Sequence, residues 1–203
     1  MDNPGLILAS QSPRRKYLLE QVGLNFKVVP SQVDEQYVSG ISPDTLVKTL
    51  AEAKAKDVAR RFSEHWVIGA DTIVYINGRI LGKPDSVDTA REMLQQLDNN
   101  VHQVLTGYAI CNAARKAFII DMERTEVYFK RLCQAEIEWY LQTNEPYDKA
   151  GAYAIQGLGM YLVKQVNGSY TNVVGLPVCE VLDHLFRAGV IEPQVGGSWR
   201  ICT

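Results

Sequence analysis

The apolar pattern of the first thirty residues predicts a strand, a helix and a second strand. Leu6–Ala9 is a short apolar run, and Phe26–Val29 is another of the same kind, so each is expected to form a buried strand. Between them, Ser12 stands where a helix N-cap belongs, and Pro13 stands at the first helical position. A helix is therefore expected to begin after Ser12.

The central part of the chain predicts a long helix followed by a strand and a tight turn. The helix is expected to begin near Ser42 and Pro43 and to end at about Phe62. Residues 67–76 are apolar except for two polar positions, which indicates a strand. The dipeptide Asn77-Gly78 then favours a hairpin, because both residue types tolerate the positive φ angles of its turn.

The second half of the chain continues the mixture of strands and helices. Strands are expected over 104–110 and 117–129, a hairpin around Asn167-Gly168, and helices over 88–97, 134–142 and 176–187. No regular strand–helix–strand repeat and no low-complexity linker interrupts the pattern. We expect an α/β or α+β fold, with a mixed sheet and flanking helices, in one domain over residues 1–189, and a tail over 190–203.

Composition narrows the class of protein. A chain of 203 residues with 46% hydrophobic residues can bury one sizeable core. No apolar run is long enough to cross a bilayer and no signal sequence precedes the first strand, so we expect a cytoplasmic protein with no membrane partner. A net charge of −2 argues against nucleic-acid polymers as partners. The cysteines and histidines are too scattered to form a zinc site, a redox pair or a local triad.

The first candidate for chemistry is the arginine pair Arg14 and Arg15, in the first turn of the first helix. Cations are unfavourable there by about 0.3–1 kcal/mol each, because the helix dipole is positive at its N-terminus. A bound phosphate would offset that cost, since backbone N–H groups, the dipole and two guanidinium groups all favour an anion. The alternative is that both side chains lie on the surface and point away.

Two lysines of the long helix are separated by helical geometry. Lys54 falls on the stripe formed by the apolar residues Val47, Leu50, Ala51 and Val58, whereas Lys56 falls on the opposite face. An inward lysine either extends to the edge of the core or directs its charge into a site, and an outward lysine is usually solvated. We therefore expect Lys54 to be functional and Lys56 to lie on the surface.

Asp71 interrupts the apolar run VIGADTIVYI. Burying a carboxylate without a partner costs several kcal/mol, so the residue requires a partner or a function. A divalent cation, a nearby lysine and a role as general base would each account for it. The alternative is an aspartate that caps a break between two strands.

Four further residues are candidates in loops. Lys83 follows a strand in LGKPDS, at a position that suits a ligand site but also a solvated loop lysine. Asp148 and Lys149 precede Ala150-Gly151-Ala152, where small side chains would let a ligand approach the backbone. Gln156 carries an amide that can donate to and accept from a base edge, although a glutamine in a turn is the ordinary alternative.

In order along the chain, these segments resemble the Maf family of nucleotide pyrophosphatases over about residues 5–188. The segments are LILASQSPRR, the acidic pair in VDEQ, AKAK, IGADTIV, GKP, DKAGAYAIQG and NVVGLP. The resemblance implies two lobes around a nucleotide cleft, in a fold similar to that of the inosine triphosphatases. It also implies a divalent cation (Mg²⁺ or Mn²⁺), a house-cleaning role toward modified nucleotides and often a homodimer.

Carried over position by position, the resemblance implies a specific site. Asp71, Lys54, Lys83 and Arg15 would be catalytic, and Glu35 and Asp71 would hold the metal. Residues implied in substrate binding are Ser10, Arg14, Arg15, Thr72, Asp148, Lys149 and Gln156. This set contains Lys54 and Asp71, which the residue pattern also favours.

The resemblance further implies a substrate. The branch of the family that acts on 7-methyl-GTP has an aromatic residue before the arginine pair, Gln after the catalytic Asp, and Glu at the later Gln position. This chain has PRR, Thr72 and Gln156, which match the branch that hydrolyses dTTP and UTP to the monophosphate and pyrophosphate. Two alternatives remain: a 7-methyl-GTP or modified-purine pyrophosphatase, and a nucleotide-binding regulator of cell division and septum formation.

Overall fold

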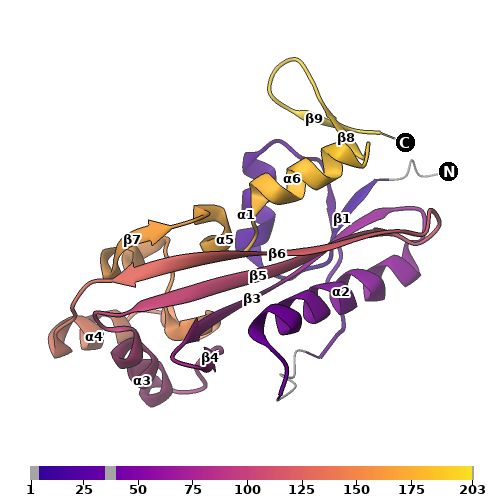
Figure 1. Cartoon of the computed structure of the whole chain (residues 1–203). Coiled ribbons are helices and arrows are strands. Elements are labelled where there is room, and N and C mark those ends of the chain that lie inside the picture. Colours follow the sequence, from indigo (N-terminus) through magenta and orange to yellow (C-terminus); the bar gives the residue numbers. More distant parts are fainter. Residues whose placement is uncertain (1–4, 35–39, 203) are drawn as a thin grey trace. The chain divides into compact units, whose positions relative to one another are not determined.

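The computed structural model describes residues 5–34 and 40–202, and Figure 1 labels most of its helices and strands. The helices are α1 (Pro13–Gln21), α2 (Pro43–Arg61), α3 (Val87–Leu97), α4 (Gln134–Leu141), α5 (Tyr170–Val174) and α6 (Val178–Arg187). Three short 3₁₀ turns are η1 (Pro146–Asp148), η2 (Ala150–Ala152) and η3 (Gly157–Leu162). The strands are β1 (Leu6–Leu8), β2 (Lys27–Val28), β3 (Trp66–Ile76), β4 (Arg79–Leu81), β5 (Val101–Asn112), β6 (Ala117–Phe129), β7 (Val163–Asn167), β8 (Ile191–Pro193) and β9 (Trp199–Ile201).

Within the described residues, seven strands form a mixed sheet in the order β2-β1-β3-β5-β6-β7, with β4 paired to β3. Strand β1 runs parallel to both β2 and β3, whereas β4 and β7 are antiparallel to their partners. Two-residue turns favour antiparallel neighbours, and Asn77 and Gly78, at φ 49° and 79°, make such a turn between β3 and β4. The expected mixed α/β class with flanking helices is confirmed.

Most sequence predictions of helix ends are also confirmed, because capping is local. The Ser12 side chain accepts the backbone N–H of Arg15, and Pro13 opens α1. The Ser42 side chain accepts the N–H of Thr45 in the same way at the start of α2. These hydroxyls satisfy N–H groups that have no partner inside the helix.

The hairpin predicted around Asn167-Gly168 is wrong. Strand β7 ends at Asn167 and the chain then enters α5 instead of a returning strand. Gly168 adopts φ 125°, Ser169 N–H donates to Thr125 Oγ1 at 3.0 Å, and Ser169 Oγ accepts the N–H of Asn172 at 3.2 Å. The serine therefore acts as a helix cap, a function that outweighed the turn preference of the Asn-Gly pair.

The chain divides into two compact units. Unit 1 takes the described residues of Met1–Asp71, Thr106–Met122 and Gly175–Thr203, and unit 2 takes Thr72–Leu105 and Glu123–Val174. Three boundaries between them fall within strands β3, β5 and β6, and the fourth follows α5. None of the helices in the described ranges combines the length and the apolar character needed to span a bilayer.

Close packing of α2 characterises unit 1. A Cβ atom added to Gly69 on β3 would lie 2.4 Å from the carbonyl oxygen of Ala51, and one added to Gly107 on β5 would lie 2.3 Å from that of Val47. Glycine is needed at both positions because the helix backbone occupies the space of a side chain. This close approach sets the distance between side chains on the inner face of α2 and the strands that it covers.

The C-terminal strands β8 and β9 form an antiparallel hairpin in unit 1. Trp199 N–H donates to the carbonyl oxygen of Gly23 at 3.4 Å, and Cys202 N–H donates to that of Val190 at 2.8 Å. A side chain at Gly23 would meet Gly197 O at 3.1 Å. The hairpin thus packs against the turn that follows α1.

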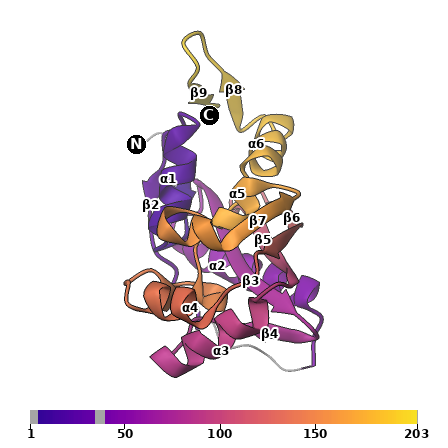
Figure 2. The ribbon, with the colours of Figure 1, turned by 90° about the vertical axis from the view of Figure 1, so that its left-hand side faces the viewer.

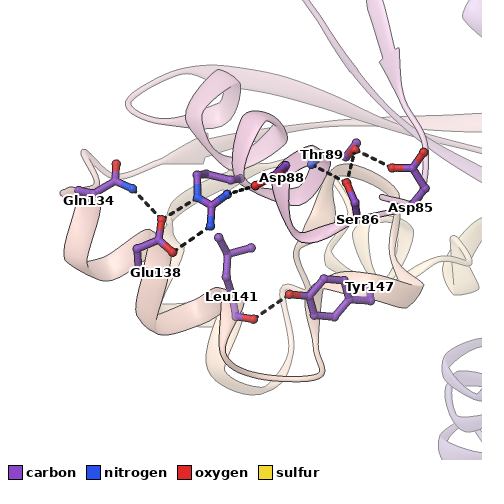
Figure 3. Close-up of polar contacts among 9 residues, drawn as sticks. Asp85, Ser86, Asp88, Thr89, Gln134, Glu138, Leu141 and Tyr147 are labelled. Carbon is purple, nitrogen blue, oxygen red and sulfur yellow. Dashed lines mark hydrogen bonds and ion pairs between the residues drawn. The ribbon is translucent and has the colours of Figure 1, made fainter.

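In unit 2, helices α3 and α4 lie side by side (Figures 1 and 2). Arg91 on α3 donates to both carboxylate oxygens of Glu138 on α4, at 2.7 and 3.1 Å; Glu138 is labelled in Figure 3 and Arg91 is not. Figure 3 also shows Ser86 capping α3 and the Tyr147 hydroxyl donating to the carbonyl oxygen of Leu141. These contacts anchor the loop before α3 and the turn after α4.

The core of unit 2 contains a buried histidine, His102. Its Nε2 atom lies 2.7 Å from the hydroxyl of Tyr153, and the rings of Phe129 and Tyr153 pack on it edge to face. Burial lowers the pKa of His102 from 6.5 to about 3. The ring is therefore neutral in the folded protein at neutral pH.

His102 should make the protein less stable in acid. The pKa of His102 is lower in the folded protein than in the unfolded chain. The stability that its neutral ring gives the fold is therefore fully present above pH 6.5 and is lost as the pH falls toward 3. When the pH is lowered from 7 to 4.5, we expect His102 to reduce the free energy of unfolding by about 2–3 kcal/mol. His102→Gln keeps a polar partner for Tyr153 without titrating, and its urea midpoint should fall less over this range than that of the unsubstituted chain. Equal falls in the two proteins would contradict the assignment.

Candidate functional site

Lys54 and Asp71 form a buried ion pair in unit 1. Lys54 Nζ lies 2.7 Å from Asp71 Oδ1, and the two side chains are only 5% and 8% exposed. Lys54 lies on the inner face of α2, and Asp71 lies within β3, whose strand continues without a break to Ile76. The strand-capping alternative for Asp71 is therefore wrong, and the nearby-lysine explanation is confirmed.

The small residues around this pair explain how the two side chains meet. Gly69, two residues before Asp71, faces Ala51 and Ala55 of α2, and its missing side chain lets the helix backbone approach the strand. Lys54 lies between these two alanines along the helix. Lys56, two residues further on, is exposed and pairs with Glu52 at 2.5 Å, as expected for the outer face.

Arg15 is buried, and its guanidinium group binds oxygens from three separate segments. Its Nε atom donates to the carbonyl oxygen of Gly175 at 2.8 Å, and Nη1 donates to Ala70 O at 2.9 Å and to Ser10 Oγ at 3.3 Å. These three oxygens come from the segment before α6, from β3 and from the loop between β1 and α1. Arg15 therefore holds the residue next to Asp71 in place, and the alternative of a surface arginine is wrong for it.

Ser10 and Arg14 complete the candidate residues around α1. Ser10 is buried and its hydroxyl oxygen also accepts the backbone N–H of Ser12 at 3.1 Å. Arg14 is half-buried in the first turn of α1. Ser10, Arg15, Lys54 and Asp71 thus all belong to unit 1, where Arg15 links Ser10 to the backbone one residue before Asp71 and Lys54 pairs with Asp71 from α2.

A second group of candidate residues lies in unit 2. Lys83 is exposed between β4 and α3, and Asp148 is exposed at the end of η1. Lys149 Nζ donates to Asp148 Oδ1 at 2.5 Å and to the carbonyl oxygen of Glu145 at 2.8 Å. Gly151 N–H donates to the carbonyl oxygen of Gly82 at 3.0 Å, which joins the GKP and DKAGA segments.

The small residues after Lys149 serve internal packing. Gly151 has φ 72°, and a Cβ atom there would lie 3.0 Å from a methyl group of Val74. Ala152 is fully buried in the core of this unit. Val74 therefore fills the space that a side chain at Gly151 would take, and the approach of a ligand to this segment stays a prediction.

Gln156 and Thr72 are the candidates for base selectivity. Gln156 is half-buried at the start of η3, and no hydrogen bond joins its side-chain amide to another residue in the described part of the chain. Thr72 follows Asp71 directly in β3 and is half-buried. Successive side chains of a strand point to opposite faces, so the hydroxyl of Thr72 and the carboxylate of Asp71 lie on different sides of β3.

Comparison with known proteins identifies the family. The family model described as Maf-like protein matches residues 5–188. The chain belongs to the Maf family. A protein named dTTP/UTP pyrophosphatase from Geotalea uraniireducens (strain Rf4) is 51% identical over 187 residues, which cover 92% of this chain and 96% of that protein. One with the same name from Halalkalibacterium halodurans is 53% identical over 173 residues, covering 85% and 90% of the two chains.

A solved structure of the Ham1 protein of Staphylococcus aureus aligns with 78% of this Maf chain and 79% of its own, at 14% identity and a TM-score of 0.45. A likeness at that level adds nothing to the family assignment, which rests on the sequence matches. The match to the family ends at residue 188, just before the hairpin of β8 and β9.

Of the two metal ligands that the family resemblance implies, Asp71 lies within the described residues. Asp71 supplies a carboxylate with one oxygen held by Lys54, and Glu35 lies outside the described residues. Within the described ranges, no group of three His, Cys, Asp or Glu side chains forms a ready metal cluster. Magnesium commonly binds through one or two carboxylates and substrate phosphates, so a carboxylate donor such as Asp71 fits it.

Sequence reasoning missed the residues that act through backbone geometry. Gly69 and Gly107 admit α2, and Gly175, at φ 132°, presents its carbonyl oxygen to Arg15. A glycine inside an apolar strand pattern is a signal of close backbone approach, and it was available at both strand positions. No local signal indicated that Arg15 would donate to Gly175, 160 residues away.

Proposed function

We propose that this chain is a nucleoside triphosphate pyrophosphatase that hydrolyses dTTP and UTP to the monophosphate and pyrophosphate. The observation that carries the proposal is a buried Lys54–Asp71 pair in a chain whose relatives at 51% and 53% identity are named dTTP/UTP pyrophosphatase. A pure binding module would lack acidic residues at the catalytic positions, whereas this chain has both Glu35 and Asp71.

Asp71 is the proposed general base. Lys54 holds Oδ1, so the carboxylate has one fixed orientation and Oδ2 remains to orient and deprotonate the attacking water. The water attacks the α-phosphorus and pyrophosphate leaves. Arg15 fixes the backbone at Ala70, directly before Asp71, and so holds the base at a constant position.

The remaining cationic groups neutralise the phosphates. Lys54, Lys83 and Lys149 supply ammonium charges, and Arg14 and Arg15 add guanidinium charges in the first turn of α1, where the helix dipole also favours an anion. Glu35 is the proposed ligand of a divalent cation. Asp71 is the alternative second ligand, in place of its role as base, because one carboxylate oxygen is already held by Lys54. Ser10 and Asp148 complete the proposed substrate contacts. When bound, Mg²⁺ or Mn²⁺ would withdraw charge from the phosphate oxygens and stabilise the leaving pyrophosphate.

The test is product analysis with a panel of nucleotides. Purified protein is incubated with dTTP, UTP, CTP, dITP, GTP and 7-methyl-GTP, with Mg²⁺, Mn²⁺ or EDTA, and pyrophosphate and orthophosphate are measured separately. We expect metal-dependent pyrophosphate release that is fastest with dTTP and UTP. Orthophosphate release would refute the cleavage site, preference for 7-methyl-GTP would refute the base selectivity, and absence of turnover would favour a nucleotide-binding regulator.

Gln156 is the proposed reader of the pyrimidine base. Thymine and uracil present an O4 acceptor beside an N3–H donor, and a glutamine amide can donate to the first and accept from the second. Gln156→Glu leaves only acceptors, so O4 loses its donor. We expect kcat/KM for dTTP to fall by about 10- to 100-fold, with a smaller change for CTP, because an unpaired buried polar group costs about 1–3 kcal/mol.

The measurement is kcat/KM for dTTP and CTP with both proteins under one metal condition. Gln165→Glu is the control, because Gln165 is exposed on β7 and belongs to no candidate site. An unchanged ratio of dTTP to CTP hydrolysis in Gln156→Glu would remove Gln156 from base recognition.

The location of the enzyme follows from the proposed activity, whereas its assembly does not. The substrates are nucleotides of the cytoplasm, so we propose that the enzyme acts there, and modified pyrimidine nucleotides are candidates within the same substrate class. A homodimer stays a prediction from family resemblance. Light scattering of the protein as it elutes from a size-exclusion column would test it.

A further inference from the structure

Glu145 holds together the segment that contains Gln156. It lies in unit 2, directly before η1, and both of its carboxylate oxygens are used. Oε1 accepts the backbone N–H of Leu158 at 2.8 Å, and Oε2 accepts the N–H of Gly159 at 3.0 Å and the hydroxyl of Tyr140 at 3.1 Å. The carboxylate therefore fixes the backbone just after Gln156.

Tyr140 extends these contacts to the other side of Gln156. Its buried hydroxyl donates to Glu145 and accepts the backbone N–H of Ala154 at 3.2 Å. Burial is the largest influence on this hydroxyl and raises its pKa, so it remains a neutral donor. Glu145 and Tyr140 thus hold the chain both two residues before Gln156 and two residues after it.

The glycines that follow Gln156 are explained by the same contacts. Gly157 has φ 69°, and a Cβ atom there would lie 2.3 Å from Glu145 Oε1. A Cβ atom on Gly159 would lie 2.3 Å from the carbonyl oxygen of Ala154 and 2.6 Å from the Tyr140 hydroxyl. Side chains at either position would displace the carboxylate or the hydroxyl from the backbone groups that they bind.

We propose that Glu145 is a positioning residue that orients Gln156, and that it thereby sets the selectivity for thymine and uracil nucleotides over cytosine nucleotides. A charged acceptor of two backbone N–H groups forms stronger hydrogen bonds than a neutral one, which restricts the motion of the intervening residues. This inference rests on the proposed function, because it takes Gln156 as the group that reads the base. Glu145 itself does not touch the reacting atoms.

Glu145→Gln is the sharpest variant, since it preserves size and replaces one acceptor oxygen with an NH₂ group. Both oxygens face N–H donors, so either orientation of the amide loses at least one hydrogen bond. The backbone carbonyl that accepts Lys149 is unchanged. The matched control is Glu126→Gln on β6, whose carboxylate likewise accepts a tyrosine hydroxyl and an amide N–H, from Tyr128 and Asn167, away from this segment.

Two measurements test the inference on the full chain. In hydrogen exchange, peptides that cover residues 154–160 should exchange about tenfold faster in Glu145→Gln, because one charge-assisted hydrogen bond is lost. Their exchange rate should not change in Glu126→Gln. In kinetics, the ratio of kcat/KM for dTTP to that for CTP should fall by about tenfold, while CTP hydrolysis stays within about threefold. Tyr140→Phe removes the hydroxyl alone and should shift both readouts in the same direction.

The outcomes separate this inference from the proposed function. Unchanged exchange in Glu145→Gln and Tyr140→Phe would overturn it. Faster exchange with an unchanged dTTP to CTP ratio would also overturn it, because the segment would then not control selectivity. An unsubstituted protein that does not discriminate dTTP from CTP would instead refute base reading by Gln156, whatever the exchange result.

Discussion

Asp71→Asn should reduce the rate of pyrophosphate release from dTTP by about 100-fold or more, because a positioned general base contributes about 10²–10⁴-fold. Asparagine has the size of aspartate and its Oδ1 atom can still accept from Lys54 Nζ, which lies 2.7 Å away in the present structure. The substitution therefore removes the charge and the basicity with little change in shape. Both kcat and kcat/KM should fall.

The measurement is steady-state pyrophosphate release with dTTP at several Mg²⁺ concentrations. Asp121→Asn is the control, since Asp121 lies in the same unit, pairs with Lys48 at 4.0 Å and is half exposed. It should retain nearly full activity. Activity of Asp71→Asn within threefold of the unsubstituted protein would remove Asp71 from the catalytic residues, and rescue by high Mg²⁺ would assign it to metal binding instead.

Lys54→Met should cause the largest loss of stability. It leaves the Asp71 carboxylate, 8% exposed, without the ammonium group that the structure gives it. Removing one partner of a buried ion pair typically costs about 3–5 kcal/mol, because the other charge stays buried. Urea unfolding at neutral pH measures this loss as a lower midpoint at similar slope.

Two further variants isolate the cause. Lys56→Met, on the outer face of the same helix, removes an exposed lysine that pairs with Glu52 and should change stability by less than about 1 kcal/mol. The double variant Lys54→Met/Asp71→Asn should be more stable than Lys54→Met alone, because no charge is left buried. A double variant as unstable as the sum of the single variants would show that the pair does not interact as described.

The sequence predicted those features that depend on neighbours along the chain. Ser12 and Ser42 mark the starts of their helices because a hydroxyl satisfies N–H groups within three residues. Lys54 could be assigned to an inner face and Lys56 to an outer face because the helical period is fixed. The carboxylate of Asp71 lies in an otherwise apolar strand, and its burial would be too costly without a partner. In the structure that partner is Lys54.

Prediction from the sequence fell short where a local preference competes with a contact between distant residues. Asn167-Gly168 has the composition of a hairpin turn, but the Ser169 hydroxyl caps a helix at Asn172, and the backbone N–H of Ser169 is held by Thr125, which is distant in sequence. The small residue Gly151 suggested space for a ligand, whereas Val74 lies where its side chain would be. In both cases the deciding contact joins residues that no window along the chain contains.

By itself, the sequence determined the mixed α/β class, the helix ends, the burial of Lys54 and Asp71, and the family, through motifs in order along the chain. The tertiary structure alone decided that Lys54 is the partner of Asp71, that Arg15 holds the backbone next to it, and that Glu145 fixes the segment around Gln156. The physical reason is range. Caps, periodicity and burial cost act within a few residues, whereas the identity of a buried partner depends on which distant segments the folded backbone brings together.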